Sequence, residues 1–169
     1  MSLLLRIANA INRITKFFGK LAVVLLLFMI ALIFYNVISR YIFSSNNIWM
    51  QELEWHLLMP ITLIGISVLL MEKGHVRVDV LYGKFPAHIK NLIDFSSMIF
   101  GFVLSIFLIK YSQGFVEISW SVYESSPNPS GMPGRYILKS IMPICFVLFG
   151  LQCLANSICY FAEFKKNKK

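Results

Sequence analysis

Two groups of polar side chains in this sequence could do chemistry, and they flank one apolar segment, residues 57–71. Glu52, Glu54 and His56 come before it, and the run Gly-His-Val-Arg-Val-Asp at 74–79 follows it. Carboxylates close to an imidazole are typical of proton transfer or metal binding. Polar groups near hydrocarbon are costly, so those present usually support a fold, a subunit interface or an ion path.

The spacing of these residues argues against a metal site. Glu52 and His56 are four residues apart and would share one face of a helix. However, no second histidine follows at ligand spacing, and the sequence is not His-Glu-x-x-His. A proton-coupled role would need a carboxylate at mid-membrane, whereas both glutamates precede the apolar segment. We therefore expect these side chains to pair within the protein or at a subunit interface.

The other histidines and the cysteines do not indicate a cofactor site. His56 is the one histidine close to an apolar segment, which argues against haem held by two histidines. The cysteines, Cys145, Cys153 and Cys159, contain no Cys-x-x-Cys pair and are expected to be buried apolar side chains. No nucleophile or cofactor loop accompanies residues 75–79. We expect no catalytic residue, no cofactor and no metal, and therefore not an enzyme.

The composition places most of the chain in lipid. Of 169 residues 57% are apolar and 14% are charged, and the mean hydropathy is +0.69. Average soluble domains have about 45–50% apolar and about 25% charged residues. The net charge of +8 could suggest nucleic-acid binding, but the basic residues lie at the ends of apolar runs. This distribution indicates membrane topology instead.

Four segments are candidates to cross the membrane, which takes roughly 20 helical residues. Residues 21–39 are uncharged for 19 positions and residues 140–162 for 23, while 57–71 and 95–109 are uncharged for 15 each. We predict spans at about 20–39, 53–71, 93–111 and 137–161. The expected fold is an all-α integral membrane protein with four transmembrane helices, and residues 1–169 form a single membrane domain.

The basic residues predict the orientation. Counted over alternate segments, the two termini and the second loop carry 12 lysines and arginines, against 4 in the first and third loops. The positive-inside rule then places both termini and the second loop in the cytoplasm, so the topology is N-in and C-in.

Three local features complete the expected architecture. Residues 3–18 have helix-period apolar positions and predict an amphipathic helix on the inner surface; the alternative is a simple cytoplasmic extension of the first span. Pro60 predicts a packing kink or a hinge. The turn formers of 125–134 must break the chain before the last span, whereas 111–123 either continue the third span or lie at the outer interface.

The order and spacing of the polar residues resemble a known family, the small four-helix membrane subunit of TRAP transporters (tripartite ATP-independent periplasmic transporters, the DctQ-like Q subunit). The resemblance covers nearly the whole chain, but its specific residues lie between Asn36 and Asp79, and Pro60 departs from the pattern. The residues that carry it are Asn36, Arg40, Tyr41, Trp49, Glu52, Gly65, His75, Arg77 and Asp79.

The resemblance implies a scaffold for a larger transporter, in a bacterial inner (cytoplasmic) membrane. Such systems combine a periplasmic substrate-binding protein, a large membrane subunit that moves organic acids with the sodium gradient, and this small subunit. Dicarboxylates and sialic acids are both substrates within the family. The small subunit packs against the large one and helps to dock the binding protein. Physically this suits the sequence, because transport sites usually appear as paired, interrupted helices, which are not evident here.

We expect the polar residues of the resemblance to maintain the fold or to contact the large subunit. The outer loops, 44–51 and 111–134, are the candidate surface for the binding protein. The alternative hypothesis is a self-sufficient small transporter, oligomeric and coupled to protons or cations. Sodium-dependent uptake by the chain alone would distinguish this alternative from the scaffold.

Overall fold

The computed structural model describes residues 2–45, 47–72 and 85–167, and all of its regular elements there are helices. Their order is α1 (Ser2–Ile42), α2 (Ile48–Met71), α4 (Ala87–Ser121), α5 (Arg135–Lys139) and α6 (Ile141–Asn167). In this part of the chain, four helical segments are long and apolar enough to cross a membrane: Leu3–Ile42, Ile48–Met71, Ile89–Ser121 and Arg135–Ala162. The prediction of an all-α chain with four membrane-length helices is confirmed.

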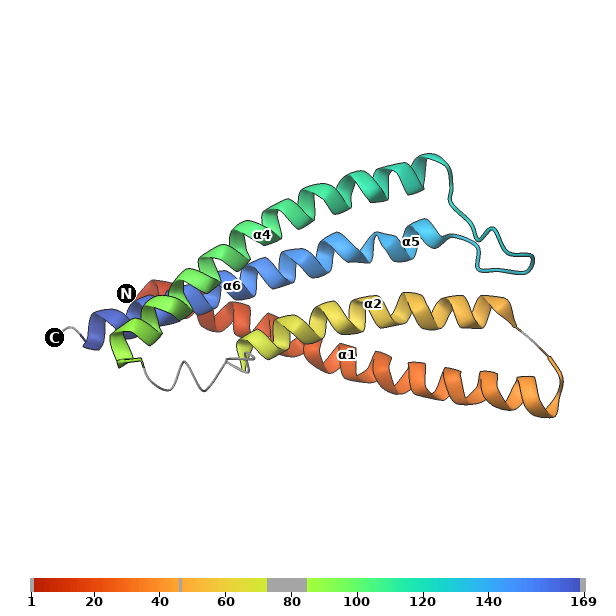
Figure 1. Cartoon of the computed structure of the whole chain (residues 1–169), viewed down its shortest axis with the longest axis horizontal. Helices are drawn as coiled ribbons and strands as arrows, with labels where there is room; N and C mark the ends of the chain where they lie inside the picture. The colour runs from red at the N-terminus through yellow and green to blue at the C-terminus, as the bar shows by residue number, and fades with distance from the viewer. Residues whose placement is uncertain (1, 46, 73–84, 168–169) are drawn as a thin grey trace.

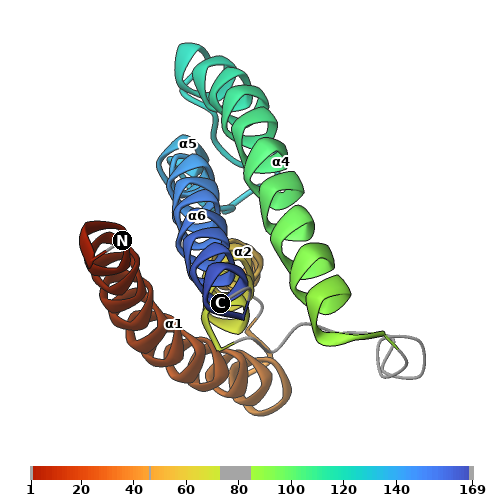
Figure 2. The same cartoon turned by 90° about the vertical axis from the view of Figure 1, so that its left-hand side faces the viewer.

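The helices run alternately up and down along one long axis (Figure 1). The start of α1 and the end of α6 lie at one end of the molecule, which we call the terminal end. The connections α1–α2 and α4–α5 lie at the opposite end, the loop end. Helix α6 is central, because it packs against α1, α2 and α4. Figure 2 shows it between α1 and α4.

Two helices are much longer than their predicted spans. Helix α1 has 41 residues and α4 has 35, or about 60 Å and 50 Å of helix, whereas the hydrocarbon core is about 30 Å thick. Residues 3–18 are the first turns of α1, with no break before the span. This segment therefore extends the first span as one continuous helix, and its location, on the membrane surface or in the cytoplasm, stays a prediction. Residues 111–121 continue α4.

Small residues set the helix spacing. A Cβ built on Gly150 of α6 would lie 2.4 Å from the Ser105 hydroxyl of α4, and one on Gly101 would lie 3.0 Å from the Cys153 sulfur. Close approach at small residues is how helices associate in lipid, where apolar burial gives little drive. Cys145 and Cys153 are buried, as predicted, and Cys159 is partly buried.

Helix α2 continues through Pro60, which is buried inside it. At the loop end, α4 stops at Ser121 and the chain re-enters helix only at Arg135, immediately after Gly134 in the left-handed conformation (φ 70°). A positive φ is one that glycine adopts readily, so Gly134 suits the sharp turn into α5. The intervening residues 122–134 form the loop that builds the first cluster described below.

Candidate functional site

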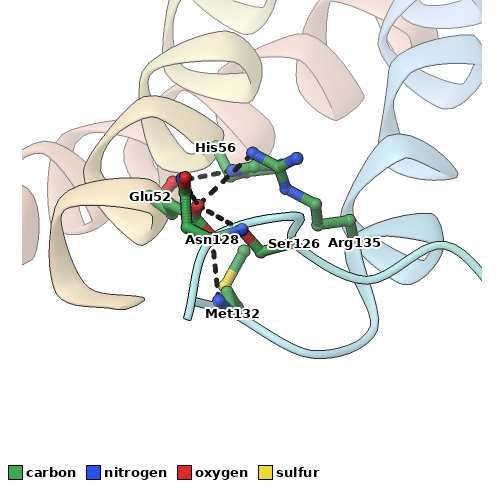
Figure 3. Close-up of polar contacts among 6 residues, drawn as sticks. All are labelled: Glu52, His56, Ser126, Asn128, Met132 and Arg135. Carbon is green, nitrogen blue, oxygen red and sulfur yellow. Dashed lines mark hydrogen bonds and ion pairs between the residues drawn. The ribbon is translucent and has the colours of Figure 1, made fainter. Parts of the chain in front are cut away.

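A buried carboxylate organises the loop end of the molecule. Glu52 lies one turn into α2 and is 8% exposed. The loop 122–134 folds over it, so that groups from the loop and from α5 converge on the carboxylate (Figure 3). A charged group in this position requires partners, because an unpaired buried charge is strongly destabilising.

Both oxygens of the Glu52 carboxylate accept hydrogen bonds from the loop. Oε1 accepts from the Ser126 hydroxyl and from the Asn128 amide at 2.9 Å, and Oε2 accepts from the Met132 backbone N–H at 2.8 Å. The Arg135 guanidinium lies 3.7 Å from Oε1. We call these five residues the Glu52 cluster. It joins the start of α2 to the chain that precedes α6.

The loop folds this way because its short side chains satisfy its own backbone. The Ser126 hydroxyl accepts from the Asn128 N–H at 3.1 Å, and the Gly131 N–H donates to the Asn128 carbonyl at 3.0 Å. Gly131 is required at its position, because a Cβ there would lie 2.3 Å from the Ser126 hydroxyl and 3.0 Å from the Asn128 carbonyl oxygen. The turn chemistry that predicted a break therefore also presents the donors to Glu52.

His56 lies beside this cluster, one turn further along α2 (Figure 3). Its Nδ1 is 2.6 Å from the Glu52 backbone carbonyl, so Nδ1 carries the donated proton. The two residues share one helix face, as their spacing predicts. The imidazole thus donates to a backbone carbonyl of its own helix, and this contact supports the structure of α2.

A second ion pair holds α5 against the end of α4. The Lys139 ammonium donates to the Glu124 carboxylate, which also accepts from the Ser119 hydroxyl. The hydrogen bond from Lys139, then that from Ser119, hold the pKa of Glu124 below its ordinary value of 4.5. The Trp120 indole N–H donates to the Ser140 hydroxyl at 2.8 Å, and its ring meets Tyr136 edge-on.

A buried amide network connects three helices near the terminal end. Gln152 of α6 is fully buried, and its Oε1 accepts from the Thr15 hydroxyl of α1 at 2.7 Å. Its Nε2 donates to Oδ1 of Asn12 at 2.9 Å and to Oδ1 of Asn156 at 3.0 Å. Asn156 in turn donates to the Leu70 carbonyl, near the end of α2, at 2.7 Å. We call these residues the Gln152 network.

The Gln152 network is not among the sites predicted from the sequence, although the sequence contains a signal for it. Gln152 and Asn156 are amides within the uncharged run 140–162 and lie four residues apart on one helix face. Thr15 and Asn12 lie in the segment that was interpreted as a surface helix. Their side chains instead face α6, since Thr15 is fully buried and Ala8 and Ile11 pack with Ala155.

The residues that carry the family resemblance divide by burial. Asn36 is buried, and its Nδ2 donates to the Glu54 carboxylate at 3.1 Å, which joins α1 to α2. Glu52 is also buried and forms the centre of the Glu52 cluster. By contrast, Arg40, Tyr41, Trp49 and Gly65 have exposed positions. His75, Arg77 and Asp79 lie outside the described residues. Asn36 and Glu52 therefore stabilise contacts within this chain, through separate partners.

The chemistry available to these groups is hydrogen bonding between helices. Within residues 2–45, 47–72 and 85–167, no three side chains of His, Cys, Asp or Glu come together as a metal site would require. The buried polar side chains of the Glu52 cluster and the Gln152 network contact other helices or loops of the same chain. Each cluster thus connects elements that are far apart in sequence.

Comparison with known proteins gives a consistent match. A family model described as "Tripartite ATP-independent periplasmic transporters, DctQ component" matches residues 29–163. A "Putative TRAP transporter small permease protein" of Haemophilus influenzae is 21% identical over 133 residues, which are 79% of this chain and 77% of that protein. The "C4-dicarboxylate TRAP transporter small permease protein DctQ" of Vibrio cholerae is 30% identical over 106 residues, 60% of this chain and 46% of that one.

A further relative is much longer than this chain. The "Sialic acid TRAP transporter permease protein SiaT" of Haemophilus influenzae is 26% identical over 101 residues. These residues are 60% of this chain but 16% of the relative. The segment similar to this chain is therefore a minor part of one longer permease polypeptide.

Proposed function

The chain belongs to the DctQ component family of TRAP transporters, and we propose that it is the small scaffold subunit of a transporter that imports organic acids. It is a multi-pass membrane protein, and its family supports a role in transport. In the proposed complex a large membrane subunit moves the substrate, a C4-dicarboxylate or a sialic acid, with the sodium gradient. A periplasmic binding protein delivers it.

The observation that supports the scaffold role is that the buried polar groups of the Glu52 cluster and the Gln152 network have their partners within this chain. Glu52 is held by the loop before α5, and Gln152 connects α1 and α6, while Asn156 reaches the end of α2. Transport sites, by contrast, present polar groups and unwound backbone to a substrate or an ion. The clusters of this chain serve its own helix packing, which suits a rigid support.

Association with a large subunit is supported by the length of one relative. In the sialic acid permease, the part similar to this chain makes up 16% of one polypeptide. Two proteins that form a lasting complex can be parts of a single chain in a relative, because fusion preserves a permanent contact. We propose that this chain forms the corresponding contact as a separate subunit.

The exposed members of the family motif are the proposed contact residues. Gly65 lies on an open face of α2, where an added Cβ would have no neighbour within 4 Å. Tyr41 and Trp49 are 80% and 41% exposed near the loop end. Glycine at an exposed helix face allows another transmembrane helix to approach closely. The proposal extends to His75, Arg77 and Asp79 by their place in the motif.

The proposed orientation follows the basic residues. With both termini cytoplasmic in a bacterial inner membrane, the loop end faces the periplasm. The loop 122–134 and the α1–α2 connection then face the binding protein, and they are its proposed docking surface. Because the Glu52 cluster connects the loop to α2, it would hold this surface in a fixed position.

The experiment is co-purification of this chain with the large TRAP membrane subunit of the same organism. Gly65→Leu is expected to reduce co-purification by roughly tenfold while leaving the thermal stability of the chain alone unchanged. The matched control is Gly114→Leu on α4, since a Cβ at Gly114 also has no neighbour within 4 Å. If both variants co-purify with the large subunit in the same yield as the wild type, the α2 face is excluded as the contact.

Uptake in liposomes separates the scaffold from a self-sufficient transporter. Sodium-dependent uptake of an organic acid is expected from the complex with its binding protein and not from this chain alone. Uptake by the chain alone, driven by sodium or by protons, would overturn the scaffold assignment.

A further inference from the structure

One exposed side of α1 changes from basic to apolar along the helix. Its members recur every seven residues and are all exposed: Arg6, Arg13, Lys20, Leu27, Phe34 and Tyr41. Residues at this spacing stay close to one side of a helix, with a drift of about 20° per repeat. Thr15, which is fully buried against α6, lies on the opposite side of α1. The side of α1 turned away from α6 is therefore basic up to Lys20 and apolar beyond it, with Phe17 as an exposed apolar exception.

The side of α4 turned away from α6 changes in the reverse order. Leu92, Ile99 and Ile106 are exposed at the same spacing, and a second exposed row beside them consists of Val103, Lys110 and Glu117. Ser105, which is buried next to Gly150 of α6, lies on the other side of the helix. No charged residue occurs from 95 to 109. The outward side of α4 is therefore apolar up to this point and polar from Lys110 onward, with Ile118 as an exposed apolar exception.

Contacts with α6 place the basic part of α1 and the apolar part of α4 at one level of the bundle. The Thr15 hydroxyl donates to Gln152 at 2.7 Å, and a Cβ built on Gly150 would clash with the Ser105 hydroxyl. Gly150 and Gln152 are two residues apart on α6, and α1 and α4 lie on opposite sides of this helix (Figure 2). At this level the exterior of the molecule is basic on one side and apolar on the other.

An upright bundle cannot satisfy both exteriors. If the long axis stood along the membrane normal, Arg13 and Val103 would have nearly the same depth. Either the basic side chains would face hydrocarbon, which is costly, or the apolar row of α4 would face water. A tilt removes this conflict. Packed helices lie about 8–10 Å apart, so α1 and α4 are separated by about 16–20 Å across α6. A tilt of about 40°, the upper end of the range for membrane helices, shifts the membrane boundary by about 15 Å between them.

We propose that the bundle crosses the membrane with a steep tilt, so that its lipid-facing surface is an oblique band. On the α1 side the band covers the uncharged run 21–39, and on the α4 side it covers 95–109. The tilt also accounts for the length of α4. Its 35 residues measure about 52 Å, and at a tilt of about 40° they extend about 40 Å along the membrane normal, which is close to the thickness of a bilayer with its headgroups.

The tilt decides which surfaces reach water. In the proposed topology it raises residues 110–121 of α4 and the adjoining loop 122–134 above the outer membrane surface. The polar turns of α4 then extend the docking surface that is proposed for the binding protein. At the other end of the molecule, Arg6 and Arg13 lie in the cytoplasm. The names of the two sides rest on the proposed function, whereas the tilt does not, because an inverted chain would exchange the two sides and keep the oblique band.

Lipid photolabelling of the wild-type chain tests the band. The full chain is placed in phosphatidylcholine nanodiscs in which a fraction of the lipid carries a diazirine at the end of one acyl chain, close to the bilayer centre. We expect the labels on α1 to centre on 27–34 and those on α4 to centre on 99–106. Labels on Phe17 together with 99–106, or on 27–34 together with 110–117, would give each level of the bundle a single depth and overturn the proposal.

Spin labels at two pairs of positions measure depth independently, in a chain whose three cysteines are replaced by alanine. Arg13→Cys on α1 and Val103→Cys on α4 lie near one level of α6. Accessibility to a water-soluble nickel complex, relative to oxygen, is expected to be several-fold higher at the first position than at the second. In the pair near the loop end, Glu117→Cys on α4 should be several-fold more accessible to nickel than Phe34→Cys on α1.

Equal nickel accessibility within either pair, or the reverse order, would overturn the tilt. If the cysteine-free chain fails to fold, the labelling of the wild-type chain decides alone. Neither arm depends on a large subunit, so a failure of the tilt would leave the co-purification and uptake results, and with them the scaffold role, to be judged separately.

Discussion

The Glu52 carboxylate accepts a hydrogen bond from the Met132 backbone N–H at 2.8 Å across 80 residues of sequence. This contact closes the loop end of the molecule, because Glu52 lies one turn into α2 and Met132 lies just before α5. The charged side chain that first suggested chemistry instead positions a loop. Its partners are donors from one short segment, so the effect of removing it can be measured directly.

Replacing Glu52 should destabilise the loop end. Glu52→Ala leaves the Met132 N–H and the Asn128 amide without their acceptor and Arg135 without its counter-charge. We expect a loss of roughly 3 kcal/mol, the range found when one partner of a buried pair is removed. Thermal unfolding in detergent, followed by thiol-reactive fluorescence at the buried cysteines, measures it. The control is Glu117→Ala, an exposed carboxylate on α4, and equal shifts in both variants would contradict the prediction.

Gln152 should be coupled energetically to Thr15. Gln152→Leu conserves volume but leaves the Thr15 hydroxyl and the side-chain Oδ1 of Asn156 without their partner. The expected cost is about 1–2 kcal/mol, since hydrogen bonds between membrane helices are individually modest. In a double-mutant cycle, Thr15→Val should cost less in the Gln152→Leu background than in the wild type.

The exposed Gln113 of α4 provides the control for this cycle. Gln113→Leu should leave the melting temperature close to the wild-type value. Additive effects of the Thr15 and Gln152 variants would show that the network does not act as a unit.

Gly150 should not tolerate a side chain. Gly150→Leu places a Cβ 2.4 Å from the Ser105 hydroxyl and forces α4 away from α6. We expect a loss of roughly 1–3 kcal/mol from overpacking, with partial recovery in the double variant with Ser105→Gly. Thermal unfolding measures both, and Gly114→Leu on the open face of α4 is the control. No recovery in the double variant would indicate that the clash lies elsewhere.

The contact between Glu124 and Lys139 should give a pH-dependent contribution to stability. Because the pKa of Glu124 is lowered from 4.5 in the folded chain, chiefly by the hydrogen bond from Lys139, the contribution is fully present above that value. It is lost as the pH falls through the folded pKa. The difference in melting temperature between the wild type and Glu124→Gln should therefore shrink below about pH 4.5. A difference that stays constant or grows at lower pH would contradict this.

Apolar run length, turn formers and the order of the polar motif were enough to predict four membrane-length helices, a break before the last span and the family. These properties are local, since lipid requires each segment to satisfy its own backbone as a helix. The segment 3–18 shows the limit of such reasoning. Its apolar period fits a membrane surface as well as a neighbouring helix, and only the fold shows that Thr15 faces Gln152 of α6.

The partners of the polar residues were decided by the tertiary structure. Sequence spacing placed Glu52 and His56 on one face of a helix, and the structure agrees. Sequence spacing could not reveal that Ser126 and Met132 supply donors to Glu52 from more than 70 residues away. Hydrophobic pattern determines which segments enter the membrane, because lipid acts on each segment independently. Which polar groups meet depends on helix order, tilt and loop path, which no single segment contains.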